Sequence, residues 1–254
     1  MSKLKSLMKA VVLPGYELVY WRWRTWRRPL APLLYRGGQH YCPICASNVR
    51  VFLGRHKERL CPVCGAAERS RVDWTFLHMK IAAYGGARIR VLHVAPEVYL
   101  AAVFRKMSNL DYVSIDLASK LAMVKMDITD LRFPNSSFDL IYCSHVLEHV
   151  VEDRKAMAEF FRVLKPGGLA LLQVPMSGAN THEDWSITSP EARRKAFGDP
   201  GHVRRYGMDY MDRLRDAGFS TTVLTAQEML SRSECDRCGV AGTRRLFSCT
   251  KDRH

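Results

Sequence analysis

The feature that most constrains this chain is an alternation of strand-like and helix-like segments after about residue 73. Short apolar runs, rich in β-branched residues, predict strands at 89–94, 112–116, 123–126, 138–143, 169–174, 220–225 and 245–250. Segments with helical character predict helices at 73–84, 97–107, 152–164 and 207–216. The alternation predicts an α/β fold, with a doubly wound, mostly parallel seven-stranded sheet and helices on both faces.

In such a sheet, ligands bind at the carboxyl ends of the central strands, and polar residues follow several of these strands here. The carboxylate of Asp116, at the end of the second strand, can accept both hydroxyls of a ribose. Asp127 follows the third strand and can accept an exocyclic adenine amine, while the Ile128 amide reads a ring nitrogen. The expected cofactor contacts at these strand ends are Asp116, Leu117, Asp127, Ile128, Ser144 and His145.

A specific series of motifs follows the third strand. Residues 126–174 contain S-F-D-x-I, then H-V-L-E-H, then R-V-L-K-P-G-G. This segment resembles the core of the class I S-adenosylmethionine-dependent methyltransferases, in the subgroup of the ubiquinone-biosynthesis and type 11 enzymes. The resemblance extends more weakly over about 89–250. It implies a Rossmann-like methyltransferase domain, S-adenosylmethionine as cofactor, and methyl transfer as the activity.

The turn after the first strand, in RVLHVAPE at 90–97, departs from that family. Such enzymes usually have D-x-G-x-G here, and the turn approaches the methionine part of the cofactor. His93 stands at the acidic position, and Ala95 and Glu97 stand at the two glycine positions. We include all three in the cofactor site, with Glu97 as a helix cap or as a contact of the ammonium or sulfonium group. The alternative is a plain strand–helix junction in a protein that has lost cofactor binding.

Methyl transfer is an in-line displacement, so the protein mainly aligns the acceptor with the sulfonium methyl. A general base is needed only for a protonated acceptor, and the candidates are His145 and His202. A plain hydrogen-bonded loop histidine is the alternative for His145, and we expect His149 to support the fold. Residues 175–205, which lack clear periodicity and mix aromatic with charged side chains, are expected to form a lid over the acceptor.

Four cysteines precede this domain in the pattern C-x2-C-x15-C-x2-C. They are Cys42, Cys45, Cys61 and Cys64. The spacing predicts a zinc-ribbon-like module over 39–72, whose four thiolates fill the tetrahedral shell of a structural Zn²⁺ ion. A redox dithiol and chance pairing are the alternatives. Cys235 and Cys238 form a further C-x2-C without an assigned role.

Positive charge is concentrated near the start of the chain. Residues 1–36 carry eight Lys and Arg against one Glu, which is half of the net charge of +14. We therefore separate a basic, aromatic arm at 1–38, the cysteine module at 39–72 and the α/β domain at 73–254. The arm suits peripheral contact with an anionic membrane or stacking on single-stranded nucleic acid. It also suits packing on its own domain or on the partner in a homodimer.

The sequence shows no signal-peptide layout and no apolar run long enough to span a bilayer, so we expect a cytoplasmic protein, peripheral at the inner membrane surface if the arm binds lipid. The leading hypothesis is O- or N-methylation of a small molecule, glycan or lipid-linked metabolite. The alternatives are an RNA methyltransferase that uses the ribbon and the arm, and a non-catalytic scaffold with this fold. No N-P-P-Y-type motif follows the fourth strand, which argues against methylation of a base nitrogen, and nucleic acid is the less favoured partner.

Overall fold

The computed structural model describes residues 30–54 and 59–253. Most of the predicted basic arm, including its tryptophans and lysines, therefore lies outside the described residues, and the predictions of membrane or nucleic-acid contact through 1–36 fall there. Within the described residues, no helix has both the length and the apolar composition needed to cross a membrane.

A seven-stranded sheet forms the centre of the molecule, in the order β10-β11-β7-β6-β3-β4-β5. Its strands are β3 Ile89–Val94, β4 Leu110–Asp116, β5 Val124–Lys125, β6 Phe138–Ser144, β7 Leu164–Gln173, β10 Ser220–Thr225 and β11 Arg245–Thr250. Only β11 runs antiparallel to its neighbours; the other adjacent strands are parallel. The predicted α/β fold with a mostly parallel seven-stranded sheet is confirmed.

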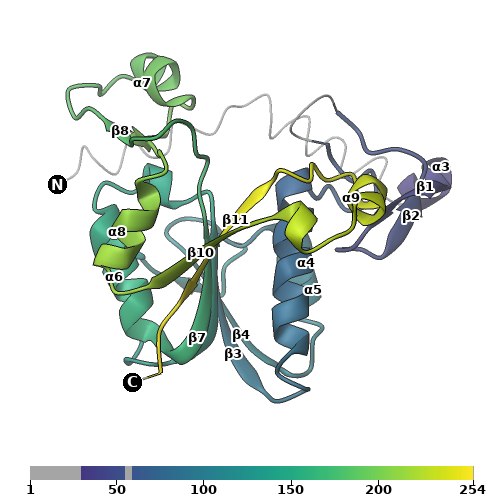
Figure 1. The fold of residues 1–254 in the computed structure, drawn as a ribbon, viewed down its shortest axis with the longest axis horizontal. Helices are drawn as coiled ribbons and strands as arrows, with labels where there is room; N and C mark the ends of the chain where they lie inside the picture. Colours follow the sequence, from purple (N-terminus) through teal and green to yellow (C-terminus); the bar gives the residue numbers. More distant parts are fainter. Residues whose placement is uncertain (1–29, 55–58, 254) are drawn as a thin grey trace.

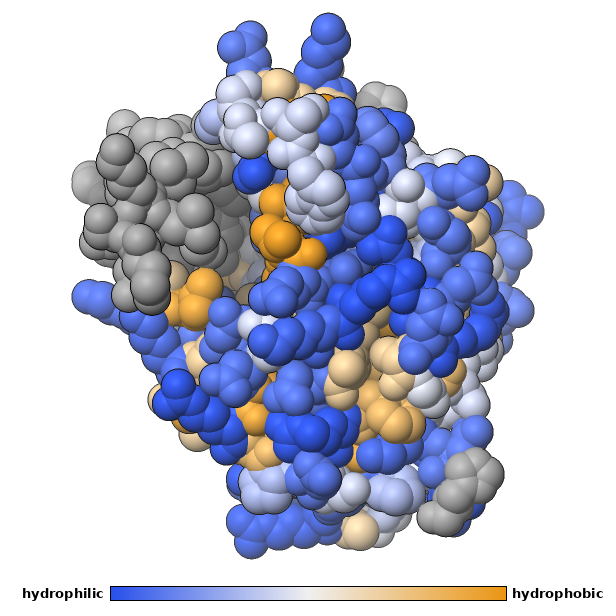
Figure 2. Space-filling model, turned by 90° about the vertical axis from the view of Figure 1, so that its left-hand side faces the viewer, coloured by the Kyte–Doolittle hydropathy of each residue, from blue (hydrophilic) through white to orange (hydrophobic). Residues whose placement is uncertain are grey.

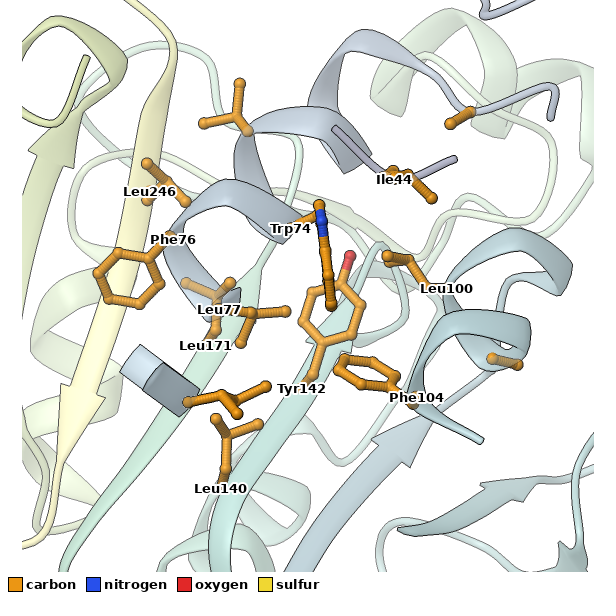
Figure 3. Packing of buried hydrophobic residues seen from close by; sticks show 14 of the residues in the cluster. Ile44, Trp74, Phe76, Leu77, Leu100, Phe104, Leu140, Tyr142, Leu171 and Leu246 are labelled. Atoms are coloured by element: carbon orange, nitrogen blue, oxygen red, sulfur yellow. The ribbon is translucent and has the colours of Figure 1, made fainter. Parts of the chain in front are cut away.

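Helices cover both faces of this sheet (Figure 1). The helices of the described residues are α3 Ala31–Leu34, α4 Glu68–Ala82, α5 Val98–Phe104, α6 Asp153–Val163, α7 Pro190–Phe197, α8 Tyr210–Asp216 and α9 Arg232–Cys238, with the short 3-10 turns η1 Leu147–His149 and η2 Ala226–Glu228. Helices α4 and α5 pack on one face, where Trp74, Phe104 and Tyr142 meet in one apolar cluster (Figure 3). Helices α6 and α8 pack on the other face and form a second cluster.

The outward side of the α6 and α8 layer is mostly hydrophilic, and its hydrophobic areas are small and separated (Figure 2). This agrees with the one-sided burial of α6, where Ala156, Met157, Phe160 and Val163 point inward. Spacings of three and four residues place such side chains on one helical face. The helix therefore buries a single apolar stripe and leaves the rest of its surface to water.

Several elements differ from the sequence prediction. Helix α4 begins at Glu68 rather than at 73, so it crosses the boundary expected at 72 between module and domain. The segment 175–205, expected to be irregular, contains α7 and a two-stranded sheet of β8 His182–Glu183 and β9 Arg204–Arg205. These elements are too short to show a period. Helix α7 is instead stabilised at its N-terminus, where Ser189 Oγ accepts a hydrogen bond from the Ala192 amide.

The N-terminal cysteine module contains an antiparallel hairpin of β1 Arg36–Cys42 and β2 Ser47–Val49. Its buried Cys42 and Ile44 belong to the same apolar cluster as α4 and the central sheet. Helix α9, from near the other end of the chain, packs against β1 (Figure 1). The module therefore shares its core with the α/β domain and is covered by a late segment of the sequence.

Arg71 of α4 joins these three parts and is fully buried. Its guanidinium donates to the backbone carbonyls of Cys238, Gly239, Arg59 and Ala66 over 2.8–2.9 Å. Its Cζ atom lies 3.9 Å from the centre of the Phe52 ring. Gly239 has φ +60°, and a Cβ atom there would lie 2.3 Å from that same ring. The close approach of α9 to the module thus depends on glycine at this position.

Candidate functional site at the carboxyl edge of the sheet

Two residues with strained backbones mark the ends of β3 and β6. Ala95 has φ +49° and His145 has φ +57°, a conformation that costs a residue with a side chain roughly 1–2 kcal/mol. The Ala95 amide donates to Ile115 O at 2.9 Å, and the His145 amide donates to Gln173 O at 2.8 Å. Ala95 therefore keeps the left-handed backbone that glycine supplies at such a turn. Strain of this kind is typical of ligand-binding positions.

A buried hydrogen-bonded chain leads from β4 to the turn after β3. His93 is fully buried, with Nδ1 3.0 Å from Tyr112 Oη and Nε2 2.8 Å from Glu97 Oε2. Glu97 Oε1 accepts from the Tyr142 hydroxyl at 3.4 Å. Glu97 precedes α5, but its side chain does not cap the helix. His93 is therefore too buried to contact a ligand directly, and it positions Glu97 instead. The Glu97 side chain is 23% exposed, so its carboxylate can contact a cationic group.

Asp73 of α4 forms a second polar group at this edge, which the sequence reasoning missed. Its carboxylate accepts from Tyr142 Oη at 3.0 Å, from Ser144 Oγ at 3.4 Å and from Gln173 Nε2 at 2.9 Å. Burial raises the pKa of Asp73 above the usual carboxyl value. The available signal was an acidic residue directly between two apolar residues, Val72 and Trp74, at the start of a segment predicted to be a helix. The network fixes the Ser144 hydroxyl, which was predicted as a cofactor contact.

The predicted ribose and adenine contacts lie at the ends of β4 and β5. Asp116 Oδ1 accepts from the amides of Ala118 and Ser119 at 2.7 and 2.6 Å. Asp127 Oδ1 likewise accepts from the amide and hydroxyl of Thr129, both at 2.9 Å. In the described part of the chain, no hydrogen bond reaches the Oδ2 atoms of these two residues, which can accept from a ligand. Leu117 is exposed and Ile128 is buried.

The two predicted catalytic histidines both lie close to one glutamate, Glu148 of η1. His145 Nδ1 is 3.2 Å from Glu148 Oε1, and His202 Nε2 is 3.9 Å from the same oxygen. His149 joins them, since its ring lies edge-to-face on His202 at 4.7 Å. Burial, and then the neighbouring His149, lower the pKa of His202, so its ring is neutral near pH 7. The structure thus brings residues 145 and 202 together from distant segments.

A cavity of about 580 Å³ opens over the carboxyl ends of β6 and β7. Its lining includes His145, Gln173 and Asp73, together with both the cysteine module and the segment before β11. The charged residues that line it are Arg59, Arg69, Arg244, Arg245, Glu68 and Asp73. Four arginines face two carboxylates, one of which has a raised pKa. The cavity is therefore positively charged and suits an anionic ligand.

The four cysteines of the N-terminal module form one compact cluster. The Sγ atoms of Cys42 and Cys64 are 3.7 Å apart, and so are those of Cys45 and Cys61. These cysteines are not disulfide-bonded. A tetrahedral ion with Zn–S bonds of about 2.3 Å would hold its sulfurs about 3.8 Å apart. The cluster therefore has the dimensions of a four-thiolate metal site. Cys235 and Cys238 lie outside it and pack in the apolar core.

Comparison with known proteins gives the class of this domain. Residues 77–172 match the family model described as a methyltransferase domain. The chain is 49% identical over 49 residues to a demethylmenaquinone methyltransferase of Clavibacter sepedonicus, covering 19% of this chain and 20% of that protein. It is 42% identical over 53 residues to a sterol 24-C-methyltransferase of Aspergillus fumigatus, covering 21% and 14%. These matches span only about a fifth or less of the relatives' length.

The fold agrees with this classification. The crystal structure of the [4+2]-cyclase SpnF superposes with a TM-score of 0.51 at 15% identity, covering 90% of this chain and 94% of that one. The sheet order, the motif series and the family match together define a Rossmann-like methyltransferase domain. The family match over residues 77–172 and the similarity to these relatives support a class I S-adenosylmethionine-dependent methyltransferase.

Proposed function

We propose that this protein transfers a methyl group from S-adenosylmethionine to an oxygen or nitrogen of an anionic acceptor. The acceptor is a small molecule, or a glycan or lipid-linked metabolite, that carries phosphate or carboxylate. The observation that carries this proposal is the arginine-lined cavity beside His145, at the edge of the sheet where ligands of this fold bind. An anionic group would be held there by charge-assisted hydrogen bonds.

The residues at the neighbouring strand ends fit the cofactor. Asp116 and Asp127 each have one carboxylate oxygen available to the adenosine part. Ala95 adopts the left-handed turn that would let the backbone come close to the cofactor. Glu97, held by His93 and Tyr142, suits the positively charged part of the cofactor. Bound S-adenosylmethionine supplies an activated methyl group, so the chain's own work is alignment and, for a hydroxyl acceptor, proton removal.

His145 is the residue best placed to remove that proton. It lines the cavity, and its side chain is 29% exposed. Its Nδ1 atom faces the buried carboxylate of Glu148, which leaves Nε2 as the ring nitrogen available to an acceptor. Asp73 lies at the same cavity, but its three hydrogen-bond donors already hold its carboxylate. We therefore assign base catalysis to His145 and a positioning role to Asp73.

The test is a methyl-transfer screen with methyl-labelled S-adenosylmethionine. The probes are separate fractions of phosphorylated and carboxylated metabolites, glycans, extracted lipids and RNA. We expect label in an anionic, non-RNA fraction, on oxygen or nitrogen in the isolated product. Label on carbon would replace the proposed acceptor atom, as the names of the C-methyltransferase relatives suggest. Label in RNA would support the RNA methyltransferase, and no cofactor binding at millimolar concentration would support the scaffold.

An Arg244→Gln variant tests the basic cavity directly. With the labelled acceptor from the screen, we expect KM to rise about tenfold, because a charge-assisted hydrogen bond is lost, while the cofactor Kd stays the same. Arg132→Gln is the matched control, since Arg132 is 81% exposed and does not line the cavity. Equal KM values for the two variants would contradict an anion site in the cavity.

An Asp116→Ala variant tests the cofactor site. Loss of hydrogen bonds from a ribose to this carboxylate should weaken S-adenosylmethionine binding roughly 10- to 150-fold by calorimetry. Asp116→Asn keeps an oxygen for the Ala118 and Ser119 amides and separates ribose binding from loop stability. Asp130→Ala, an exposed carboxylate on the next loop, should bind like the parent. Parent-like affinity in both Asp116 variants would remove the ribose assignment.

We also infer that the four-cysteine cluster holds a structural Zn²⁺ ion. The 3.7 Å spacing of the sulfurs and the C-x2-C-x15-C-x2-C pattern support this assignment. Four protein ligands leave no open position for a substrate, so the ion would stabilise the module rather than react.

A further inference from the structure

The strongest unexplained feature outside the cofactor and acceptor sites is the carboxylate of Glu148. The side chain is only 1% exposed, and neither of its oxygens has a hydrogen-bond partner within the described residues. A buried carboxylate without hydrogen bonds is costly, and native structures seldom keep one without a reason. The 3.2 Å approach of His145 Nδ1 is short enough for an ion pair but is not directed as a hydrogen bond.

Potential metal ligands surround this carboxylate. Donor atoms of Glu148, His149 and His202 all lie within 4.8 Å of one another. Bonds of about 2.0–2.2 Å to one ion would bring such donors within about 4.4 Å of each other, so small side-chain rotations suffice. His149 is exposed, which gives an ion a path from solvent.

The surroundings of His202 match those of a metal ligand. Its Nδ1 atom lies 3.3 Å from Phe197 O, and Nε2 is the atom directed to Glu148. Ligating histidines commonly donate the second ring N–H to a carbonyl, which fixes the tautomer and the ring. The Val203 amide donates to Glu148 O at 2.9 Å and ties this segment to η1. A Cβ atom at Gly201 would come within 3.0 Å of His149 Nδ1, so the backbone itself packs against that ring.

We propose that Glu148, His149 and His202 bind one divalent transition-metal ion. One carboxylate and two imidazoles suit Zn²⁺, Mn²⁺ or Fe²⁺, unlike the all-thiolate cluster of the N-terminal module. Three protein ligands leave coordination positions open, which distinguishes this site from the closed cysteine site. The ion joins η1 to the segment 175–205 and thereby fixes that segment over the sheet edge. The proposal does not depend on methyl transfer.

The test uses the full-length chain without a histidine tag and Mn²⁺ as the probe, followed by electron paramagnetic resonance. We expect one bound Mn²⁺ per chain in the parent, since thiolates compete poorly for this ion. His149→Ala and Glu148→Gln should each weaken binding by roughly tenfold or more. His78→Ala is the matched control, because His78 is exposed on α4, away from the cluster.

His149 is exposed, so its alanine variant should fold like the parent, and circular dichroism of both proteins checks this. No Mn²⁺ binding by the parent at millimolar concentration would overturn the proposal. Equal Mn²⁺ affinity of the parent and His149→Ala would also overturn it. Because the readout is metal binding, a protein without methyltransferase activity can still confirm the site, and an active protein can still fail the test.

Discussion

Removal of metal from the cluster of Cys42, Cys45, Cys61 and Cys64 is expected to unfold the N-terminal module. The binding energy of a structural zinc ion in such a site is on the order of 10 kcal/mol and becomes folding energy, since the unfolded chain has no preformed site. The module offers little else of its own, because its hairpin is short and its apolar residues are buried against other parts of the chain, namely α4, the central sheet and α9. Unfolding would also remove Arg59 from the acceptor cavity.

The measurement is thermal unfolding by circular dichroism, with released zinc quantified by a colorimetric chelator. Cys61→Ser should contain less than one zinc ion per chain and melt well below the parent. Cys238→Ser is the matched control, because this thiol is half-buried near the module but outside the cluster. A Cys61→Ser protein with the zinc content and melting temperature of the parent would refute a structural zinc site.

Replacement of Arg71 by methionine is expected to cost about 4 kcal/mol or more of folding free energy, because each buried carbonyl left without its donor costs roughly 1–3 kcal/mol. Four backbone carbonyls would lose their donor together, and methionine offers none in return. Burial lowers the pKa of Arg71, and the nearby cysteines of the cluster oppose that shift. The cation therefore also balances the negative charge of the thiolates next to it.

Urea unfolding of Arg71→Met, Arg71→Lys and the control Arg132→Met measures this cost. Lysine has a compact ammonium rather than a planar fork, so it should recover only part of the lost stability. Arg132→Met should lie within about 0.5 kcal/mol of the parent, as for other exposed positions. An Arg71→Met protein as stable as this control would show that the four carbonyl bonds add nothing net.

The strands at 89–94, 220–225 and 245–250 were predicted to the residue, because their segments are rich in apolar and β-branched residues. Other boundaries moved by a few residues. Helix α9 was not predicted, although Ser231 and Glu234 form a capping box at its start. Seven residues are too few to display a helical period, and its packing partner β1 is distant in the sequence.

The candidate site was predictable where a residue follows a strand, as at Asp116, Asp127 and His145. Asp73 was missed because helical periodicity predicts which face of a helix is buried. It does not predict which polar groups from other elements will form hydrogen bonds with a residue on that face. Its partners Tyr142 and Gln173 come from two separate strands. The positive φ of Ala95 could not be predicted from the sequence, because alanine normally avoids that conformation. Tertiary hydrogen bonds impose that conformation.

The carbonyl partners of Arg71 at Cys238 and Gly239 lie 167 and 168 residues later in the chain. A ribosome makes the protein from its N-terminus at about 5–20 residues per second, so roughly 10–30 seconds separate the arginine from these partners. During that interval the guanidinium must stay hydrated, and the nascent module lacks the surface of α9 that covers it. Final closure of this region is therefore a late event, tied to the appearance of the C-terminal helix rather than to the early emergence of the cysteines.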